Sequence, residues 1–325
     1  KISNGLIRNG HDVVNISDRD IVRLNRGIKN ISKGFDYLNN LLIETLDNYK
    51  PDAIILGHVN NINEKTLEII KNKNKNIKIT QWFEDNLSKN GPDPIANKRN
   101  FLKYAEYIDQ SFVTTDPKTL KLDKKFKCHY LPIPVDKNIE YLECYKNISP
   151  IKDLFFTMSH GVNKGVLRKN KIDVREPFVK KLIADNPNII FDIYGYNKKQ
   201  PIWSQDFYEA IYQSKMALNL SRINNIKYYT SNRIASLIGN GVCTFVDINT
   251  QLNDFFNDDE VIFYKNLNDL SKKINFYKEN NLKRNLIAKK GKEKYFRIFN
   301  NEIISDYICA RLFDKKPKKI LSWMK

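Results

Sequence analysis

The sequence predicts an α/β protein with two Rossmann-like parallel sheets. Along its 325 residues, short apolar runs typical of strands alternate with segments of helical apolar spacing. The segment Leu131-Pro-Ile-Pro-Val-Asp136 interrupts this alternation, because its two prolines force extended backbone and exclude helix. The alternation then begins again. We therefore expect two βα units, each with a parallel sheet covered by helices on both faces, joined by a proline-containing linker.

The first unit carries five expected strands. Asp52–Gly57 is a short continuous apolar run, as expected of a strand buried on both faces. The chain opens in a helix-like pattern without an initiator Met, so we expect a first strand to be missing. The expected strands are His11–Ser17, Asp52–Gly57, Ile77–Trp82, Tyr107–Thr114 and Cys128–Leu131, and the expected helices are Asp36–Asn48, Asn63–Asn72 and Asn97–Tyr107.

The second unit repeats the rhythm and ends in three helices. We expect an N-terminal domain over residues 1–133 and a C-terminal domain over 134–299, with the final helix, within 300–325, packing back on the first domain. The expected strands are Asp153–Met158, Ile189–Tyr194, Met216–Leu220, Val242–Val246 and Val261–Tyr264, and the expected helices are Arg175–Asn186, Asp206–Gln213, Asn232–Ile238, Leu267–Glu279, Asn281–Phe296 and Asn300–Phe313.

Composition narrows the class of function. The net charge of +18 favours anionic partners, although basic residues are spread over every segment and Lys and Asn are abundant throughout. The four cysteines and four histidines show no metal-ligand spacing, so we expect reduced thiols and no protein-bound metal. No apolar run is long enough to span a membrane and no signal-peptide pattern opens the chain. We expect a cytoplasmic protein, with peripheral contact at the inner membrane face as a further expectation.

The most informative segment runs from Ser214 to Asp247. A strand delivers polar residues to its carboxyl end, and a helix follows in which Ser231 or Asn232 is expected to act as the N-cap. Free N–H groups at that helix start, together with nearby cations, are suited to a phosphate or diphosphate. The alternative is an ordinary strand–helix–strand unit. The candidate donor-binding residues here are Ser221, Arg222, Lys227, Tyr228, Ser231, Asn232 and Arg233.

This segment resembles the C-terminal nucleotide-sugar-binding module of GT-B glycosyltransferases, especially the bacterial spore-maturation-protein-like group with a glycosyl transferases group 1 type domain. Arg233 opens the helix, Gly239 and Gly241 close it, and Val242–Asp247 is the next strand. The resemblance covers about the last half of the chain. It implies a GT-B fold with two domains facing across a cleft. One departure is Ser236, which stands where the family carries an acidic residue that contacts donor hydroxyls.

Two further loops are donor-site candidates. The segment Phe156 to Arg168 holds two glycines that allow close backbone approach, together with cations that could neutralise phosphate. In GT-B enzymes the matching loop touches the donor diphosphate, whereas the alternative is a surface turn. Gly195 ends the next strand where relatives hold the base, and it could equally be a turn glycine. The candidates in the first loop are Ser159, His160, Gly161, Asn163, Lys164 and Arg168.

Three strand ends of the first half offer catalytic candidates, namely Asp18, His58 and Asp85. A carboxylate or imidazole at such a position could deprotonate an acceptor hydroxyl. His58 is the strongest base candidate because the unperturbed pKa of histidine lies near neutral pH. Asp18 could instead pair with Arg19 or cap a turn, and Asp85 could cap the residues from Asn86 onward.

The resemblance and these motifs predict a glycosyltransferase. It would move a sugar from a nucleotide-sugar donor, its substrate, to a glycan, lipopolysaccharide or other surface-polysaccharide acceptor, or to an anionic lipid-linked one, in bacterial polysaccharide biosynthesis. No cofactor is expected. The alternatives are a GT-B-fold sugar-nucleotide epimerase and a non-catalytic nucleotide-sugar-binding module. A nucleic-acid-binding protein is disfavoured, because no zinc-finger, KH or RRM signature is present.

Overall fold

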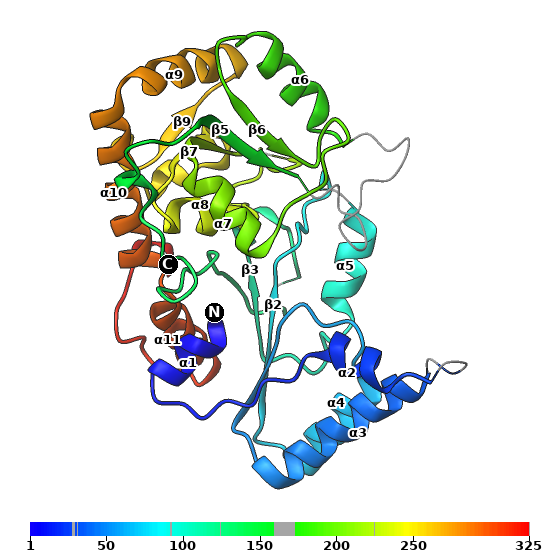
Figure 1. The fold of residues 1–325 in the computed structure, drawn as a ribbon. Coiled ribbons are helices and arrows are strands. Elements are labelled where there is room, and N and C mark those ends of the chain that lie inside the picture. The colour runs from blue at the N-terminus through cyan, green and yellow to red at the C-terminus, as the bar shows by residue number, and fades with distance from the viewer. Residues whose placement is uncertain are drawn as a thin grey trace. The chain divides into compact units, whose positions relative to one another are not determined.

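The computed structural model divides the chain into two compact units (Figure 1). It describes residues 1–325 except 28, 29, 31, 92, 124, 159–172, 224 and 325. Unit 1 comprises Lys1 and Ile133–Asn301, and unit 2 comprises Ile2–Pro132 and Glu302–Lys325. Each unit contains one parallel sheet, which confirms the α/β class with two parallel sheets.

Unit 2 is built on a four-stranded parallel sheet in the order β1-β2-β3-β4. Its core joins sheet residues such as Ile79 to helix residues such as Leu38, Leu67 and Ile70. The strands are β1 (Ala53–Leu56), β2 (Lys78–Phe83), β3 (Gln110–Val113) and β4 (Cys128–Tyr130), and the helices are α1 (Ile2–Arg8), α2 (Asp18–Asn25), α3 (Ser32–Tyr49), α4 (Glu64–Lys73), α5 (Pro94–Leu102) and α11 (Asn301–Leu312).

The C-terminal segment packs against the sheet of unit 2. Tyr307 of α11 meets Phe112 of β3 edge-on at 5.9 Å between ring centroids, and Trp323 meets Tyr307 at 5.0 Å. Such edge-to-face pairs add to the free energy of burying the rings. Asn9 also donates hydrogen bonds from its side chain to the Glu302 carbonyl and the Ser305 hydroxyl at 2.8 and 2.9 Å. The two ends of the chain are therefore held together within this unit.

Unit 1 is built on a five-stranded parallel sheet in the order β6-β5-β7-β8-β9. The strands are β5 (Lys152–Thr157), β6 (Phe191–Tyr194), β7 (Ser214–Asn219), β8 (Cys243–Asp247) and β9 (Ile262–Tyr264), and the helices are α6 (Glu176–Ala184), α7 (Ser204–Tyr212), α8 (Arg233–Gly239), α9 (Leu267–Glu279) and α10 (Asn281–Phe299).

Alternation of side chains gives this sheet two apolar faces. Leu154 and Phe156 of β5 pack in the core that includes Leu270 and Ile274 of α9. Phe155, between them, packs in the core that includes Ile211 of α7. The period of two along a strand thus places helices on both sides of the sheet. Figure 1 shows α9 and α10 running along one side of unit 1.

Three expectations for the first half require correction. Residues 11–17 form no strand, and most of their side chains are exposed. The apolar residues of this segment, Val13, Val14 and Ile16, are too few and too exposed to occupy a sheet position. The helix expected over Asn97–Tyr107 lies earlier in the chain, because α5 begins with Pro94 and ends at Leu102. The strand β1 is only partly covered, since three of its four residues are of intermediate exposure.

Across the described residues, none of the helices combines the length and the apolar character that a membrane span requires.

Candidate functional site

The carboxyl end of the sheet in unit 1 gathers the residues that follow β5 and β7. These two strands pair in parallel, with Leu154 opposite Met216. Their chains therefore leave the sheet at the same edge, where open α/β sheets bind ligands. Arg222 follows β7, and Arg233 begins α8. Asp173 and Arg175 lie just before α6, so two strand–helix connections, β5 to α6 and β7 to α8, contribute to one site.

Asp173 is surrounded by arginine side chains. Arg175 makes a bidentate pair with this carboxylate. Its Nε donates to Oδ1 at 2.7 Å, and its Nη2 donates to Oδ2 at 2.9 Å. Arg222 approaches the same carboxylate, with its Nε 3.5 Å from Oδ2. The side chain of Asp173 is only 2% exposed. Burial raises the pKa of Asp173. The hydrogen bonds and positive charge of Arg175, together with the positive charge of Arg222, outweigh this effect and lower the pKa to about 2.

Arg233 adds a third guanidinium to this cluster. Its Nη1 donates to the carbonyl oxygen of Leu220 at 3.0 Å, and its guanidinium carbon lies 5.2 Å from the centroid of the Phe156 ring. The guanidinium of Arg175 lies 6.0 Å from the same ring. Burial, with the positive charge of Arg175, lowers the pKa of Arg233 to about 9. The side chain therefore carries a charge that is poorly compensated within the protein.

The cluster of Asp173, Arg175, Arg222 and Arg233, here called the arginine cluster, has an excess of positive charge. The cluster holds three guanidinium groups and one carboxylate, so two positive charges remain among these four side chains. The Nε of Arg233 is buried without a hydrogen-bond partner. Such a group is costly unless a ligand supplies the missing acceptor. This arrangement is suited to an anion that accepts several N–H donors, such as a phosphate or diphosphate.

The start of α8 differs from the expected capping. Asn232 occupies the N-cap position with helical dihedral angles and makes no side-chain capping bond. The hydroxyl of Ser231 is buried without a partner, as is the Oδ1 atom of Asn219 at the end of β7. The expectation that either residue caps the helix by its side chain is therefore wrong, because the cap dihedral angles do not turn the chain into that geometry. Ser236 lies within α8, one turn after Arg233.

The loop before α8 is anchored through Tyr228. This residue has a left-handed φ of 65° and donates its hydroxyl to Asp254 Oδ2 at 2.6 Å. Its ring lies 4.6 Å from that of Phe255, and the ammonium of Lys227 lies 4.7 Å from its centroid. Tyr228 and Lys227 are thus oriented by contacts inside unit 1, which leaves their expected contact with a donor as a proposal.

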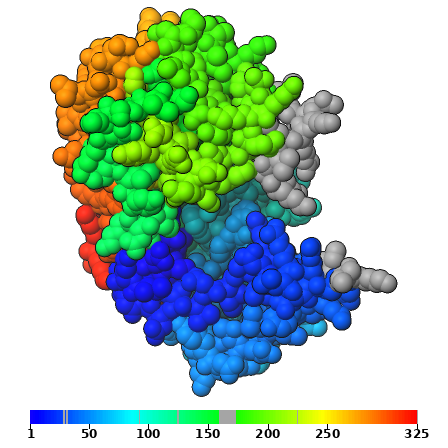
Figure 2. All heavy atoms as spheres, in the orientation of Figure 1, coloured from blue at the N-terminus to red at the C-terminus, as the bar shows by residue number. Residues whose placement is uncertain are grey.

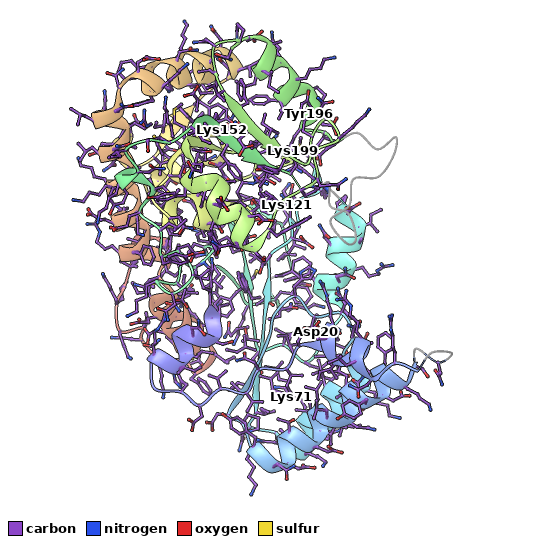
Figure 3. The ribbon with its side chains drawn as sticks, in the orientation of Figure 1. Asp20, Lys71, Lys121, Lys152, Tyr196 and Lys199 are labelled. Carbon is purple, nitrogen blue, oxygen red and sulfur yellow. The ribbon has the colours of Figure 1, made fainter. Side chains whose placement is uncertain are left out.

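Gly195 has a clear structural reason to be glycine. Its φ is +74°, and an added Cβ would lie 1.8 Å from the carbonyl oxygen of Met158. Its N–H donates to the Lys199 carbonyl at 2.9 Å, which closes a tight turn after β6. Figure 3 shows Tyr196 and Lys199 of this turn close together. The donor-side role predicted for Gly195 is untested.

Six predicted donor-site residues lie outside the described residues. They are Ser159, His160, Gly161, Asn163, Lys164 and Arg168.

In unit 2, the structure brings two of the three catalytic candidates together. His58 follows β1 and Asp85 follows β2, and these strands pair in parallel. The Nε2 of His58 lies 3.5 Å from Oδ2 of Asp85, and the imidazole lies against the ring of Phe83, with 5.3 Å between centroids and a tilt of 33°. Both side chains keep access to solvent, with exposures of 28% and 52%. Asp85 does not cap the following residues, because Asn86 accepts the N–H of Ser88 instead.

Asp18 does not end a strand. It begins α2, is 8% exposed, and accepts the backbone N–H groups of Asn60 and Asn61 at 3.1 and 3.2 Å. Asp18 does not pair with Arg19; its carboxylate instead fixes the loop that carries His58. Asp20 is exposed and accepts the Ser17 hydroxyl at 2.6 Å. The strand expected at His11–Ser17 is absent, so the prediction that Asp18 lies at a strand end is wrong.

The sequence analysis overlooked Asp173 and treated Arg175 only as the start of a helix. The available signal was the pair Asp173-Val-Arg175 directly after the glycine-containing loop, where an acid and an arginine two residues apart can bond each other. Among the described residues, no group of three or more His, Cys, Asp and Glu side chains is arranged to hold a metal ion.

Together, the two parallel-sheet units give the chain an α/β fold that matches solved structures of the GT-B class. Residues 168–310 match the family described as "Glycosyl transferase-like". This range contains the whole arginine cluster. The matched range covers less than half of the chain. A comparison with curated protein sequences gave no significant match.

Several solved structures share the fold at low sequence identity. TarM has a TM-score of 0.58 at 13% identity, covering 87% of this chain, and the chain spans 60% of the length of TarM. Sucrose-phosphate synthase from Thermosynechococcus elongatus has a TM-score of 0.54 at 10% identity, covering 94% of this chain and 81% of the synthase. HepE from Anabaena, solved in complex with UDP, has a TM-score of 0.54 at 12% identity, covering 85% of this chain and 82% of HepE.

Proposed function

We propose that the protein is a glycosyltransferase that uses a nucleotide-sugar donor and binds the donor diphosphate at the arginine cluster. The observation that carries this proposal is that Arg175 and Arg222 share the single carboxylate of Asp173, while Arg233 lies against the same Phe156 ring as Arg175. A diphosphate supplies the negative charge and the acceptor oxygens that these four side chains leave unmatched. Support also comes from the family match over this segment.

The leaving group explains why such a cluster serves the reaction. When the glycosidic bond to the donor phosphate breaks, negative charge builds up on the diphosphate oxygens. Guanidinium groups fixed by Asp173 and by the Leu220 carbonyl stabilise this charge without moving. The side chain of Arg222 is 27% exposed, against 7% for that of Arg175. It is therefore the one we expect to reach the ligand most readily.

Unit 2 is proposed to supply the acceptor side. His58 would take the proton of the attacking hydroxyl, and Asp85 would stabilise the imidazolium that forms. The acceptor proposed is a glycan, lipopolysaccharide or other surface polysaccharide. TarM was solved in complex with Fondaparinux, alpha-GlcNAc-glycerol and UDP, and HepE with UDP-glucose. On this likeness we propose a uridine nucleotide sugar as the first donor to test.

The test is calorimetric titration of the full chain with UDP, GDP, ADP and CDP, followed by turnover with the matching nucleotide sugars. We expect one diphosphate to bind and the corresponding sugar nucleotide to be consumed when a glycan acceptor is present. A folded protein that binds none of the four would overturn the proposed site. Binding of a sugar nucleotide without any turnover over an acceptor panel would instead indicate a non-catalytic binding module. Conversion of the sugar without transfer would indicate an epimerase.

A further inference from the structure

The loop between β1 and α4, residues 57–63, carries His58 and is bound by side chains from other parts of unit 2. It has no regular secondary structure. Its N–H and C=O groups therefore need partners other than those of a helix or a sheet. In Figure 1 the helices α2, α3 and α4 gather at one side of this unit. The partners that they and the segment after α5 supply determine how firmly the imidazole is placed.

Asp18 binds the N–H groups in the middle of this loop. Its Oδ2 accepts the N–H of Asn60 at 3.1 Å and that of Asn61 at 3.2 Å. Figure 2 shows the blue segment that contains α2 at the surface of the molecule, yet Asp18 is only 8% exposed. An ionised acceptor makes stronger hydrogen bonds than a neutral one, so the carboxylate anchors the loop from the side of α2.

Lys103, which follows α5, binds the C=O groups of the same stretch. Its Nζ donates to the carbonyl oxygen of Asn60 at 2.9 Å and to that of Ile62 at 3.1 Å. Burial lowers the pKa of this ammonium, and the negative charges of Glu64 and Asp18 oppose that effect. The backbone between His58 and α4 is thus bound by an anion at its N–H groups and by a cation at its C=O groups.

Two neutral side chains complete the support of the loop. The hydroxyl of Tyr104 donates to the carbonyl oxygen of Ile62 at 2.7 Å. On α3, Oδ1 of Asn39 accepts the N–H of Asn63 at 2.9 Å and the hydroxyl of Thr66 at 2.7 Å. Since these contacts come from separate helices, the position of the loop is fixed by tertiary structure and not by its own sequence.

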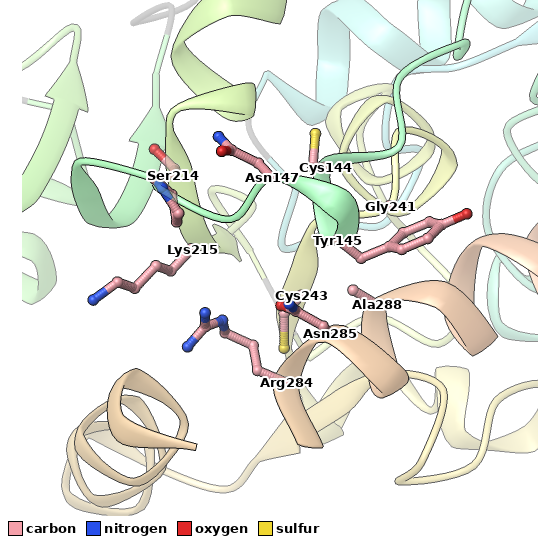
Figure 4. A pocket seen from close by; sticks show the side chains of 11 residues that line it. Cys144, Tyr145, Asn147, Ser214, Lys215, Gly241, Cys243, Arg284, Asn285 and Ala288 are labelled. Atoms are coloured by element: carbon pink, nitrogen blue, oxygen red, sulfur yellow. The ribbon is translucent and has the colours of Figure 1, made fainter. Parts of the chain in front are cut away.

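A small hollow in unit 1 shows the opposite situation (Figure 4). It lies where β7 and β8 begin, and its lining includes Ser214, Lys215 and Arg284. The Nε of Arg284 is buried without a hydrogen-bond partner, and the hollow has space for about one water molecule. We assign no ligand to it. At the loop of residues 57–63, by contrast, donors meet acceptors, as the precise placement of a catalytic group requires.

We propose that Asp18 and Lys103 are positioning residues, which fix the loop between β1 and α4 so that the imidazole of His58 stays beside the carboxylate of Asp85. This inference rests on the proposed function, in which His58 takes the proton of the attacking hydroxyl. Asp18 and Lys103 act through the backbone that follows His58 and need no contact with the acceptor. Such support matters because a displacement of about 1 Å can slow a reaction by about 100-fold.

The first test requires no substrate. The ring centroids of His58 and Phe83 lie 5.3 Å apart, so nuclear Overhauser effects between their ring protons report the position of the imidazole. We expect these effects in the parent protein, with the His58 signals assigned from His58→Ala. They should be lost or clearly weakened in Asp18→Ala and in Lys103→Met, because the loop then loses its partners. Lys103→Met keeps the aliphatic stem of the side chain and removes only the donors.

Hydrogen exchange gives a second measure of the same loop. In Asp18→Ala the amides of Asn60 and Asn61 should exchange about tenfold faster or more, because each loses a bond to an ionised acceptor. Asn60→Ala is the matched control, since it removes an exposed side chain of the loop and leaves the backbone groups in place. The control should keep the ring contacts and the slow exchange of the parent protein.

Turnover of the folded variants connects the loop to the reaction. Asp18→Ala and Lys103→Met should lower turnover by about 10- to 100-fold while the affinity for the nucleoside diphosphate stays nearly unchanged. Asp18→Asn keeps an acceptor and Lys103→Arg keeps donors, so both should recover most of the loss. Added to His58→Ala, Asp18→Ala should cost no further turnover, because its effect runs through His58.

The outcomes separate this proposal from the proposed function. Parent-like ring contacts in both Asp18→Ala and Lys103→Met would overturn the proposal, as would a further loss of turnover when Asp18→Ala is added to His58→Ala. Normal turnover of His58→Ala would instead refute the base role of His58, while the ring contacts would still show whether the two residues place it. Thermal unfolding identifies a variant that does not fold, and the partly exposed Lys103 provides the test if Asp18→Ala fails to fold.

Discussion

The imidazole of His58 and the carboxylate of Asp85 lie 3.5 Å apart because each follows one of two paired parallel strands. Phe83 supports the imidazole from one side, and Asp18 fixes the loop behind it through Asn60 and Asn61. An imidazole held in this way can accept a proton while the neighbouring carboxylate stabilises the resulting cation.

Replacement of either member of this pair should slow the reaction more than it weakens donor binding. For His58→Ala we expect turnover to fall by roughly 100- to 10,000-fold, because general-base catalysis contributes that much. Asp85→Asn should cause a smaller loss, since the imidazole remains. Steady-state turnover measured beside calorimetric donor affinity separates the two effects. Asp20→Asn, which changes an exposed carboxylate on α2, is the matched control. Near-normal turnover in both variants would remove the pair from the mechanism.

The arginine cluster should discriminate diphosphates from nucleosides. Arg233→Ala should weaken binding of a nucleoside diphosphate by roughly tenfold or more, because a charge-assisted hydrogen bond contributes about 1.5–3 kcal/mol. Binding of the uncharged nucleoside should change little. Arg222→Ala should show the same selectivity with less risk to the fold, since that side chain is 27% exposed. Calorimetric titration of each variant with the nucleoside diphosphate and with the nucleoside tests this prediction. Equal losses of affinity for the two ligands would mean that these arginines have a structural role.

Metal dependence provides a further test. Because the described residues present no cluster of ligands and the proposed diphosphate site is made of arginines, we expect turnover to survive a chelator. The measurement is the initial rate with and without excess EDTA, using dialysed enzyme. Loss of activity with EDTA and its recovery with manganese would contradict the expectation and would imply that a metal bridges the donor phosphates.

The periodicity of apolar residues predicted most of the strands and helices. The pairing of parallel strands explains why two of the candidate site residues, His58 and Asp85, could also be expected to lie close together. The apolar runs around Ile79, Phe155 and Phe245 are long enough to be recognised as strands. Since parallel strands end at one edge, residues such as His58 and Asp85 could be expected to converge without any knowledge of their distance. The pattern could not exclude a strand at 11–17, because valine and isoleucine occur there without the neighbours that would bury them.

The part of the site that escaped prediction depends on contacts between distant segments. Asp173 joins Arg175, two residues away, to Arg222, far along the chain. Phe156 supplies the ring that places Arg175 beside Arg233. The periodicity of apolar residues cannot predict such contacts, because it reflects only the local structure around each residue. The same holds for Asp18, which looks like an active-site acid in sequence and ties down a loop in the structure.

A half-buried histidine in unit 2 should make stability depend on pH. Burial, with the charges of Arg311 and Lys127, lowers the pKa of His129 to about 4, and its Nε2 lies 2.8 Å from Gln110 Oε1. The unfolded chain binds this proton near pH 6.5, so stability present above that pH is lost as the pH falls toward 4. The loss should reach about 3 kcal/mol. Urea unfolding of His129→Gln across this range should show a flatter pH dependence than the parent, whereas His11→Gln, an exposed histidine, should not.

Three glycines allow backbone strain and steric clash to be measured separately. Gly195→Ala combines both, because φ is +74° and the new Cβ would lie 1.8 Å from the Met158 carbonyl oxygen. Gly10→Ala introduces only the strain of φ +88°, since nothing lies within 4 Å, and Gly57→Ala introduces neither. The left-handed conformation costs a residue with a Cβ about 1–2 kcal/mol. We therefore expect Gly57→Ala to be nearly neutral, Gly10→Ala to lose about 1 kcal/mol of unfolding free energy, and Gly195→Ala to lose clearly more. Urea unfolding of the three variants gives the comparison. Equal losses for Gly195→Ala and Gly10→Ala would mean that the turn after β6 can move away from Met158, and the tight closure of that turn would then be wrong.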